Sequence, residues 1–77
     1  EGSYISYWEN GQLWNKGNYK NGMREGSWIA YWDNGQLQYK GNYKNGKKEG
    51  SWVDYNKDGT IKRELTGTFK NDEKISD

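Results

Sequence analysis

Short aromatic and aliphatic runs alternate with polar turns along the whole chain. The runs are rich in Trp, Tyr, Ile, Val and Leu, which favour β-strands, and the turns contain Asn-Gly or Asp-Gly, which supply the positive φ of tight hairpins. No helical period occurs, and the short connections indicate an antiparallel meander. We therefore predict strands over residues 2–8, 12–20, 26–32, 36–44, 50–56 and 60–70.

The pattern repeats every 24 residues, because the tripeptide Glu-Gly-Ser begins at Glu1, Glu25 and Glu49. The first two copies agree at 17 of 24 positions. The third copy is degenerate, with two extra residues between Gly59 and Gly67, as expected of the last unit of an array. We predict a single repeat domain over residues 1–77, with units 1–24, 25–48 and 49–74 and a polar tail over 71–77.

The hairpin turn decides which side chains share a face of the sheet. A two-residue turn at Asn10-Gly11 pairs Trp8 with Leu13, whereas a three-residue loop with glycine in the left-handed position pairs Tyr7 with Leu13. We favour the three-residue loop, because it gathers on one face the positions that keep their apolar or tyrosine character in all copies. That predicted core face carries Ile5, Tyr7, Ile29, Tyr31, Val53 and Tyr55.

Aromatic side chains on the opposite face form the candidate binding surface. They recur at about 9.5 Å, since every second strand contributes a set and strands lie about 4.8 Å apart. Such rings either bind apolar anchors of a partner protein, stack on sugars, or only shield a one-layer sheet from water. The candidate partner-binding residues are Tyr4, Trp8, Trp14, Trp28, Trp32 and Trp52.

Glycine stands two residues before three of these aromatics, at Gly2, Gly26 and Gly50. Residues two apart face the same side of a strand, so a ring can lie across the backbone that glycine leaves bare. We assign these glycines this structural role rather than phosphate binding, because no helix N-terminus is predicted to follow them.

Composition excludes several classes of function. The 77 residues include no Cys and no His, which removes disulfides, thiolate metal sites and the commonest general base. The net charge of +1 offers little attraction for nucleic acid, and the basic surface expected of a membrane-lipid binder is weak. The aromatic content of 17% indicates an ordered chain, and no apolar run approaches the roughly 20 residues of a membrane span.

Two arrangements of acidic residues are candidates for chemistry. Asp33 and Glu25 stand at opposite ends of a strand, about 23 Å apart, whereas paired carboxylates of glycosidases lie roughly 5–9.5 Å apart. The segment 54–59 copies the start of an EF-hand calcium loop, but Leu65 stands where the closing Glu belongs. We read this segment as a hairpin turn and predict no enzyme activity, no metal and no cofactor.

The middle repeat carries a family signature at Gly26, Trp28, Tyr31, Asn34, Gly35, Leu37, Gly41, Tyr43, Asn45, Gly46 and Gly50. This signature resembles the bacterial variant of the MORN (membrane occupation and recognition nexus) repeat. The resemblance implies an elongated, twisted single sheet of hairpins that scaffolds other proteins. Some eukaryotic relatives associate with phospholipid surfaces, and bacterial members are often labelled antitoxin components or occur in surface proteins.

We therefore expect an all-β, single-layer antiparallel meander that acts as a non-catalytic module for protein–protein interaction or scaffolding. The alternatives are an antitoxin that neutralises a partner toxin and a glycan-binding surface module that uses the tryptophans. Open edge strands at Gly2–Trp8 and Thr60–Lys70 predict end-to-end self-association. The start at Glu1, without Met, is expected of a fragment of a longer array.

Overall fold

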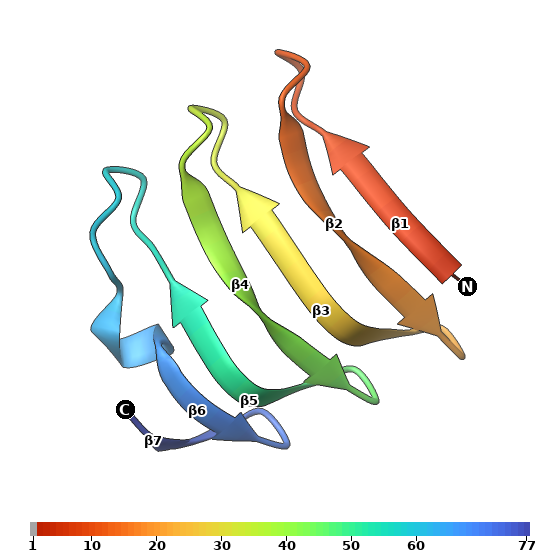
Figure 1. Ribbon diagram of the computed structural model, residues 1–77, viewed down its shortest axis with the longest axis vertical. Coiled ribbons are helices and arrows are strands. Elements are labelled where there is room, and N and C mark those ends of the chain that lie inside the picture. Colours follow the sequence, from red (N-terminus) through yellow and green to blue (C-terminus); the bar gives the residue numbers. More distant parts are fainter. Residues whose placement is uncertain (1) are drawn as a thin grey trace.

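The computed structural model describes residues 2–77 and confirms the predicted all-β meander, with one antiparallel sheet whose strands follow chain order (Figure 1). Glu1, the first residue of the first predicted repeat, lies outside the described residues. The strands are β1 (Gly2–Tyr7), β2 (Leu13–Lys20), β3 (Met23–Tyr31), β4 (Leu37–Lys44), β5 (Lys47–Asp54), β6 (Gly67–Lys70) and β7 (Glu73–Ser76).

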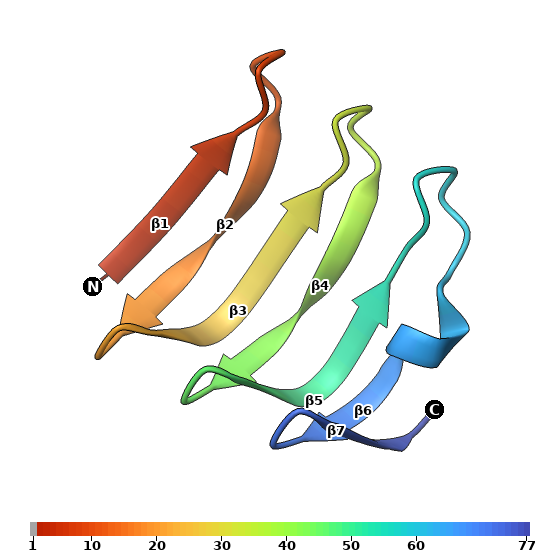
Figure 2. The same ribbon diagram turned by 180° about the vertical axis from the view of Figure 1, so that it is seen from behind.

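The sheet is a single twisted layer, and no other layer covers either face in the two views (Figures 1 and 2). Its principal extents are 35 × 32 × 11 Å, so it is flattened and nearly as wide as it is long rather than elongated in one direction. Across residues 2–77 the sole helical element is the 3₁₀ turn η1 (Arg63–Leu65). That part of the chain contains no helix long and apolar enough to cross a membrane.

The C-terminal end of the sheet differs from the sequence prediction. The predicted strand over 60–70 is interrupted by η1, which takes up the two-residue insertion, so β6 begins only at Gly67. The segment predicted as a polar tail forms β7, which pairs with β6 through Lys70 and Glu73. Within residues 2–77 the sheet thus has seven strands, with β1 and β7 at its two ends.

The hairpin loops confirm the three-residue alternative. Tyr7 pairs with Leu13, and the backbone N–H of Trp8 donates to the carbonyl oxygen of Gln12 at 2.8 Å. Gly11 takes the left-handed position with φ +90°, a conformation that favours glycine. The middle hairpin repeats this loop.

A β-bulge next to the loop overturns the predicted faces. Tyr7 pairs with Leu13 but Ser6 pairs with Asn15, so Trp14 is an extra residue with no partner opposite it. Because one extra residue reverses the alternation of side chains, the first strand of each hairpin turns to the core the side chains that were predicted to face away from it. Tyr19 and Tyr43 of the second strands stay on the core face, as predicted. The register of the middle hairpin shifts at the equivalent place.

The indole face, as we call the true core face, is lined by Tyr4, Tyr19, Trp28, Tyr43, Trp52 and Phe69. Trp28 is only 1% exposed and Trp52 only 4%, so the prediction that they project freely is wrong. The predicted core residues Ile5, Ile29 and Val53 lie on the other side of the sheet, which we call the groove face.

Candidate functional site

Glycines allow the tryptophans to pack directly on the sheet. A Cβ atom added to Gly17 would fall under 3.0 Å from the indole of Trp28, and one on Gly41 equally close to that of Trp52. Each indole therefore lies on bare backbone of the preceding strand. The predicted ring-over-glycine packing occurs, but not at the predicted glycines: Gly26 has open space around it and instead supplies a φ of +74°.

Two cations cover the buried indoles. The Arg24 guanidinium lies 4.8 Å from the Trp28 ring centroid, and the Lys48 ammonium lies 4.6 Å from that of Trp52. Arg24 also donates a 3.0 Å hydrogen bond to the Tyr43 hydroxyl. Burial lowers the pKa of Arg24, but hydrogen bonds with tyrosine hydroxyls outweigh burial and the pKa is raised. The indole face is thus sealed by its own side chains and serves as the core.

Tryptophans near the loops join successive hairpins. The Nε1 of Trp8 donates to the carbonyl oxygen of Tyr31 at 2.9 Å, and the Nε1 of Trp32 donates to that of Tyr55 at 3.2 Å. Trp14 stacks on Trp8 with ring centroids 4.7 Å apart. These contacts give Trp8 and Trp32 a structural role between neighbouring repeats.

The six predicted partner-binding aromatics therefore differ in how exposed their side chains are to solvent. A stacking surface for sugars needs accessible rings, and two of the predicted members, Trp28 and Trp52, are buried. Whether the accessible members contact a partner stays a prediction. In order of decreasing accessibility, the exposed members are Trp14 and Tyr4, the half-buried ones Trp8 and Trp32, and the buried ones Trp52 and Trp28.

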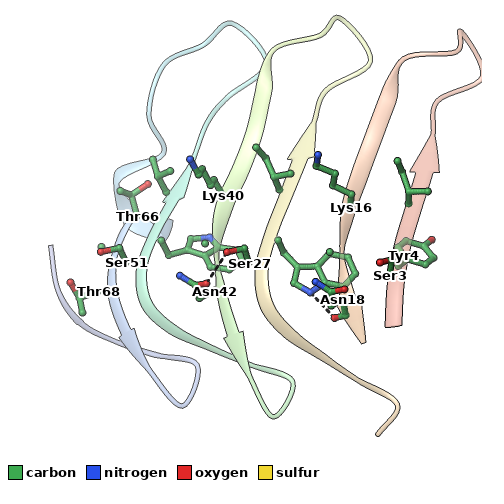
Figure 3. Close-up of a pocket in the computed structure, with 18 of the residues that line it drawn as sticks. Ser3, Tyr4, Lys16, Asn18, Ser27, Lys40, Asn42, Ser51, Thr66 and Thr68 are labelled. Carbon is green, nitrogen blue, oxygen red and sulfur yellow. Dashed lines mark hydrogen bonds between the residues drawn. The ribbon is translucent and has the colours of Figure 1, made fainter. Parts of the chain in front are cut away.

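The groove face is hollowed by a groove of about 840 Å³ that crosses the strands (Figure 3). Two rows of side chains line it, one polar and one in which aliphatic residues alternate with lysines, and Asp77 also contributes to the lining. The polar row consists of Ser3, Asn18, Ser27, Asn42, Ser51 and Thr68. The mixed row consists of Ile5, Lys16, Ile29, Lys40, Val53 and Thr66.

Among residues 2–77, the two lysines of the mixed row form no ion pair. Lys16 pairs across the strands with Ile5 and Ile29, and Lys40 pairs with Ile29 and Val53. The ion pairs found among residues 2–77 involve neither lysine. Both ammonium groups are therefore available to carboxylates or phosphates of a ligand.

The sequence contains a signal for the groove that does not involve the aromatic residues. Ser27 and Ser51 are identical in successive repeats, as are Asn18 and Asn42, although all four are exposed. Ser27 donates a 3.3 Å hydrogen bond to the Oδ1 of Asn42 across the strands, and both side chains stay exposed to solvent. Lys16 and Lys40 also recur at exposed positions, and the ion pairs found among residues 2–77 involve neither of them.

The calcium-like segment is a hairpin turn in the structure. The Asp58 carboxylate accepts hydrogen bonds from the Thr60 backbone N–H at 3.0 Å and from the Thr60 hydroxyl at 2.7 Å. These bonds lower the pKa of Asp58. Over residues 2–77, no group of three or more acidic side chains is placed to hold a metal ion.

Tyr39 makes the indole face sensitive to alkaline pH. Its ring stacks on Trp52 at 5.2 Å, and burial raises its hydroxyl pKa above the usual value of about 10. The folded state therefore favours the neutral hydroxyl of Tyr39. The resulting stabilisation is fully present below the pKa that this hydroxyl has in the unfolded state, and it is lost as the pH rises through its pKa in the folded state. In urea unfolding between about pH 8 and 11, Tyr39→Phe should lose stability less steeply than the parent chain. Equal pH slopes would contradict this assignment, and Tyr7→Phe, on an exposed ring, is the control.

Comparison with known proteins adds one match. A model of the family described as MORN repeat variant matches residues 1–21 and 24–45. These ranges cover the first two hairpins with their loops, including Gly17 and Gly41 beneath the indoles. No curated protein and no solved structure matches the chain.

Proposed function

The chain belongs to the MORN repeat variant family, and on this basis we propose that it is a non-catalytic protein-interaction module whose partner lies in the groove. The observation that carries the proposal is the mixed row, in which unpaired lysines alternate with half-exposed aliphatic side chains. Apolar contacts beside a desolvated charge pair are typical of the energetically important parts of protein interfaces.

The dimensions of the groove favour an extended segment of the partner. The groove runs from β1 to β6, a distance of roughly 24 Å at the usual strand spacing. An extended segment of about seven residues, at roughly 3.3 Å per residue, would span this distance.

The charges of the groove indicate which segment fits. Lys16 and Lys40 are two strands apart, about 9.6 Å, and each lies between aliphatic side chains. A partner segment with carboxylates at a similar spacing and apolar side chains between them would pair with both lysines. The polar row, with Ser27 and Asn42, supplies hydrogen-bonding groups for the main chain of such a segment.

Site-specific photocrosslinking tests the location of the partner. A crosslinking residue at position 27, in the groove, should give discrete protein adducts in an extract of the source cell, and one at position 47, outside the groove, should not. Reversing both groove charges, with Lys16→Glu and Lys40→Glu, should reduce the yield of those adducts by about tenfold or more, since facing like charges cost several kcal/mol.

The matched control carries Lys47→Glu and Lys70→Glu, which change the net charge equally but lie outside the groove lining. It should keep the adducts. Equal adducts from both crosslinking positions, or equal losses in both double variants, would contradict docking in the groove.

A further inference from the structure

The lining of the groove repeats at an interval that the hairpins set. Residues paired directly across the strands form the series Ile5, Lys16, Ile29, Lys40 and Val53. Each hairpin contributes two strands, so the lysines and the aliphatic side chains each recur about every 9.6 Å. The aliphatic members are β-branched and therefore stiff at χ1, so the backbone fixes their spacing. A ligand that lies along the groove has to match this interval.

The polar row has the same interval. Ser3 pairs with Asn18 in the first hairpin, and Ser27 pairs with Asn42 in the second. The Ser27 hydroxyl donates to the Oδ1 of Asn42, whereas the hydrogen bonds found among residues 2–77 do not use the Nδ2 of this exposed side chain. An asparagine Nδ2 group is a hydrogen-bond donor. The row thus offers a ligand one amide donor per hairpin.

Two extended conformations of a peptide segment differ in how well they match the groove. In a β-strand, side chains on one face recur every second residue, or about every 6.6 Å. A polyproline II helix has three residues per turn and rises about 3.1 Å per residue, so its side chains return to the same face about every 9.3 Å. The polyproline II interval agrees with that of the groove, and the strand interval is about 3 Å too short.

The main chain of a polyproline II helix also suits the polar row. This helix has no internal hydrogen bonds, so its carbonyl oxygens are free to accept from Asn18 and Asn42. In an α-helix the carbonyl oxygens are used within the helix, and two turns advance about 10.8 Å. Of these three conformations, polyproline II is the one that matches both the interval of the mixed row and the donors of the polar row.

We propose that the partner segment is a polyproline II helix with acidic residues three positions apart, an inference that rests on the docking in the groove proposed above. One column of its side chains would place carboxylates at Lys16 and Lys40. The remaining residues of each turn, proline or another apolar residue, would contact Ile29 and the other aliphatic side chains. Such a segment is already ordered before it binds, so it loses little conformational entropy.

Three labelled nine-residue peptides, measured by fluorescence anisotropy with the full chain, test the conformation. The first contains seven prolines, with glutamate as its fourth and seventh residues. The second has the same composition, with glutamate as its fourth and sixth residues. The third keeps the glutamates of the second but replaces the prolines with valine and threonine, which favour a β-strand. The first peptide should bind at least about tenfold more tightly than the second, in which both glutamates cannot face the lysines together.

The other outcomes separate this proposal from the docking in the groove. Equal binding of the two proline peptides, or tighter binding of the valine–threonine peptide, would overturn the polyproline II assignment while an extended segment could still occupy the groove. If no peptide bound but the crosslinked adducts at position 27 were found, the assignment would again be wrong and the docking would stand. Absence of both peptide binding and adducts would overturn both proposals.

Protein variants locate the bound peptide. Replacing both groove lysines, with Lys16→Met and Lys40→Met, should remove the difference in affinity between the two proline peptides. The matched control, with Lys47→Met and Lys70→Met, changes the net charge equally outside the groove lining and should keep the difference. Circular dichroism verifies that both double variants are folded. A difference that persists without the groove lysines would place the peptide elsewhere and overturn the proposal.

Discussion

Trp28→Ala should destabilise the fold by about 3–5 kcal/mol, the usual loss for a large aromatic removed from a core. The indole is 1% exposed, contacts Tyr4, Tyr19 and Tyr43 edge-on or tilted, and lies beneath the Arg24 guanidinium. A domain of this size has roughly 4–12 kcal/mol of stability. The variant is therefore expected to be partly unfolded at room temperature, as measured by urea denaturation followed by far-ultraviolet circular dichroism.

The control for this experiment is Trp14→Ala. Trp14 is 42% exposed and makes a stacking contact with Trp8, so its loss should cost no more than about 1 kcal/mol. If Trp14→Ala proved the more destabilising of the two, the indole face could not be the core. The same comparison separates a role in folding from a role in binding, because Trp14 is accessible to a partner and Trp28 is not.

Gly41→Ala should be nearly as damaging, although it adds only one methyl group. That methyl would fall inside the Trp52 indole, under 3.0 Å from its atoms, and the indole is held by Tyr39, Tyr43 and the backbone below it. Overpacking costs about 1–3 kcal/mol where side chains can move, and occasionally more. We expect a loss of stability at the upper end of that range or beyond, because the methyl group added to the backbone of β4 would clash with a buried ring.

Ser27→Ala is the matched comparison for Gly41→Ala. It changes a side chain of similar size on a neighbouring strand, but on the exposed groove face. Its unfolding free energy should stay within about 0.5 kcal/mol of the parent chain. If the urea unfolding midpoints of Gly41→Ala and Ser27→Ala were comparable, the Trp52 indole could not pack on the backbone of β4.

The sequence was sufficient to predict the meander and the three-residue loops, because these depend on local signals. The period follows from residue identity, and the loops follow from glycine in the left-handed position. The faces could not be predicted in the same way. Trp14 looks like an ordinary strand residue, yet it is the extra residue of a bulge, and one extra residue exchanges the two faces.

The same error displaced the candidate site. Once the tryptophans were assigned to an exposed face, Lys16 and Lys40 became their neighbours instead of groove residues. The glycines were the signal that could have corrected this: Gly17 and Gly41 lie in the middle of strands, where glycine is unfavourable unless something approaches the backbone closely. β7 was missed because its four residues contain one apolar side chain, so its strand status depends on pairing with β6.

The side-chain bonds from Trp8 and Asn10 reach the next hairpin, and each strand pairs solely with the strands before and after it in the chain. Such a molecule is a linear series of coupled units, whose cooperativity depends on nearest-neighbour coupling rather than on one central nucleus. Unfolding can therefore begin at an end and advance hairpin by hairpin. Gain or loss of a repeat would change the length of the groove by about 9.6 Å while keeping the same lining. The number of repeats can therefore set the length of partner segment that the groove accommodates, with no change to the packing of the core.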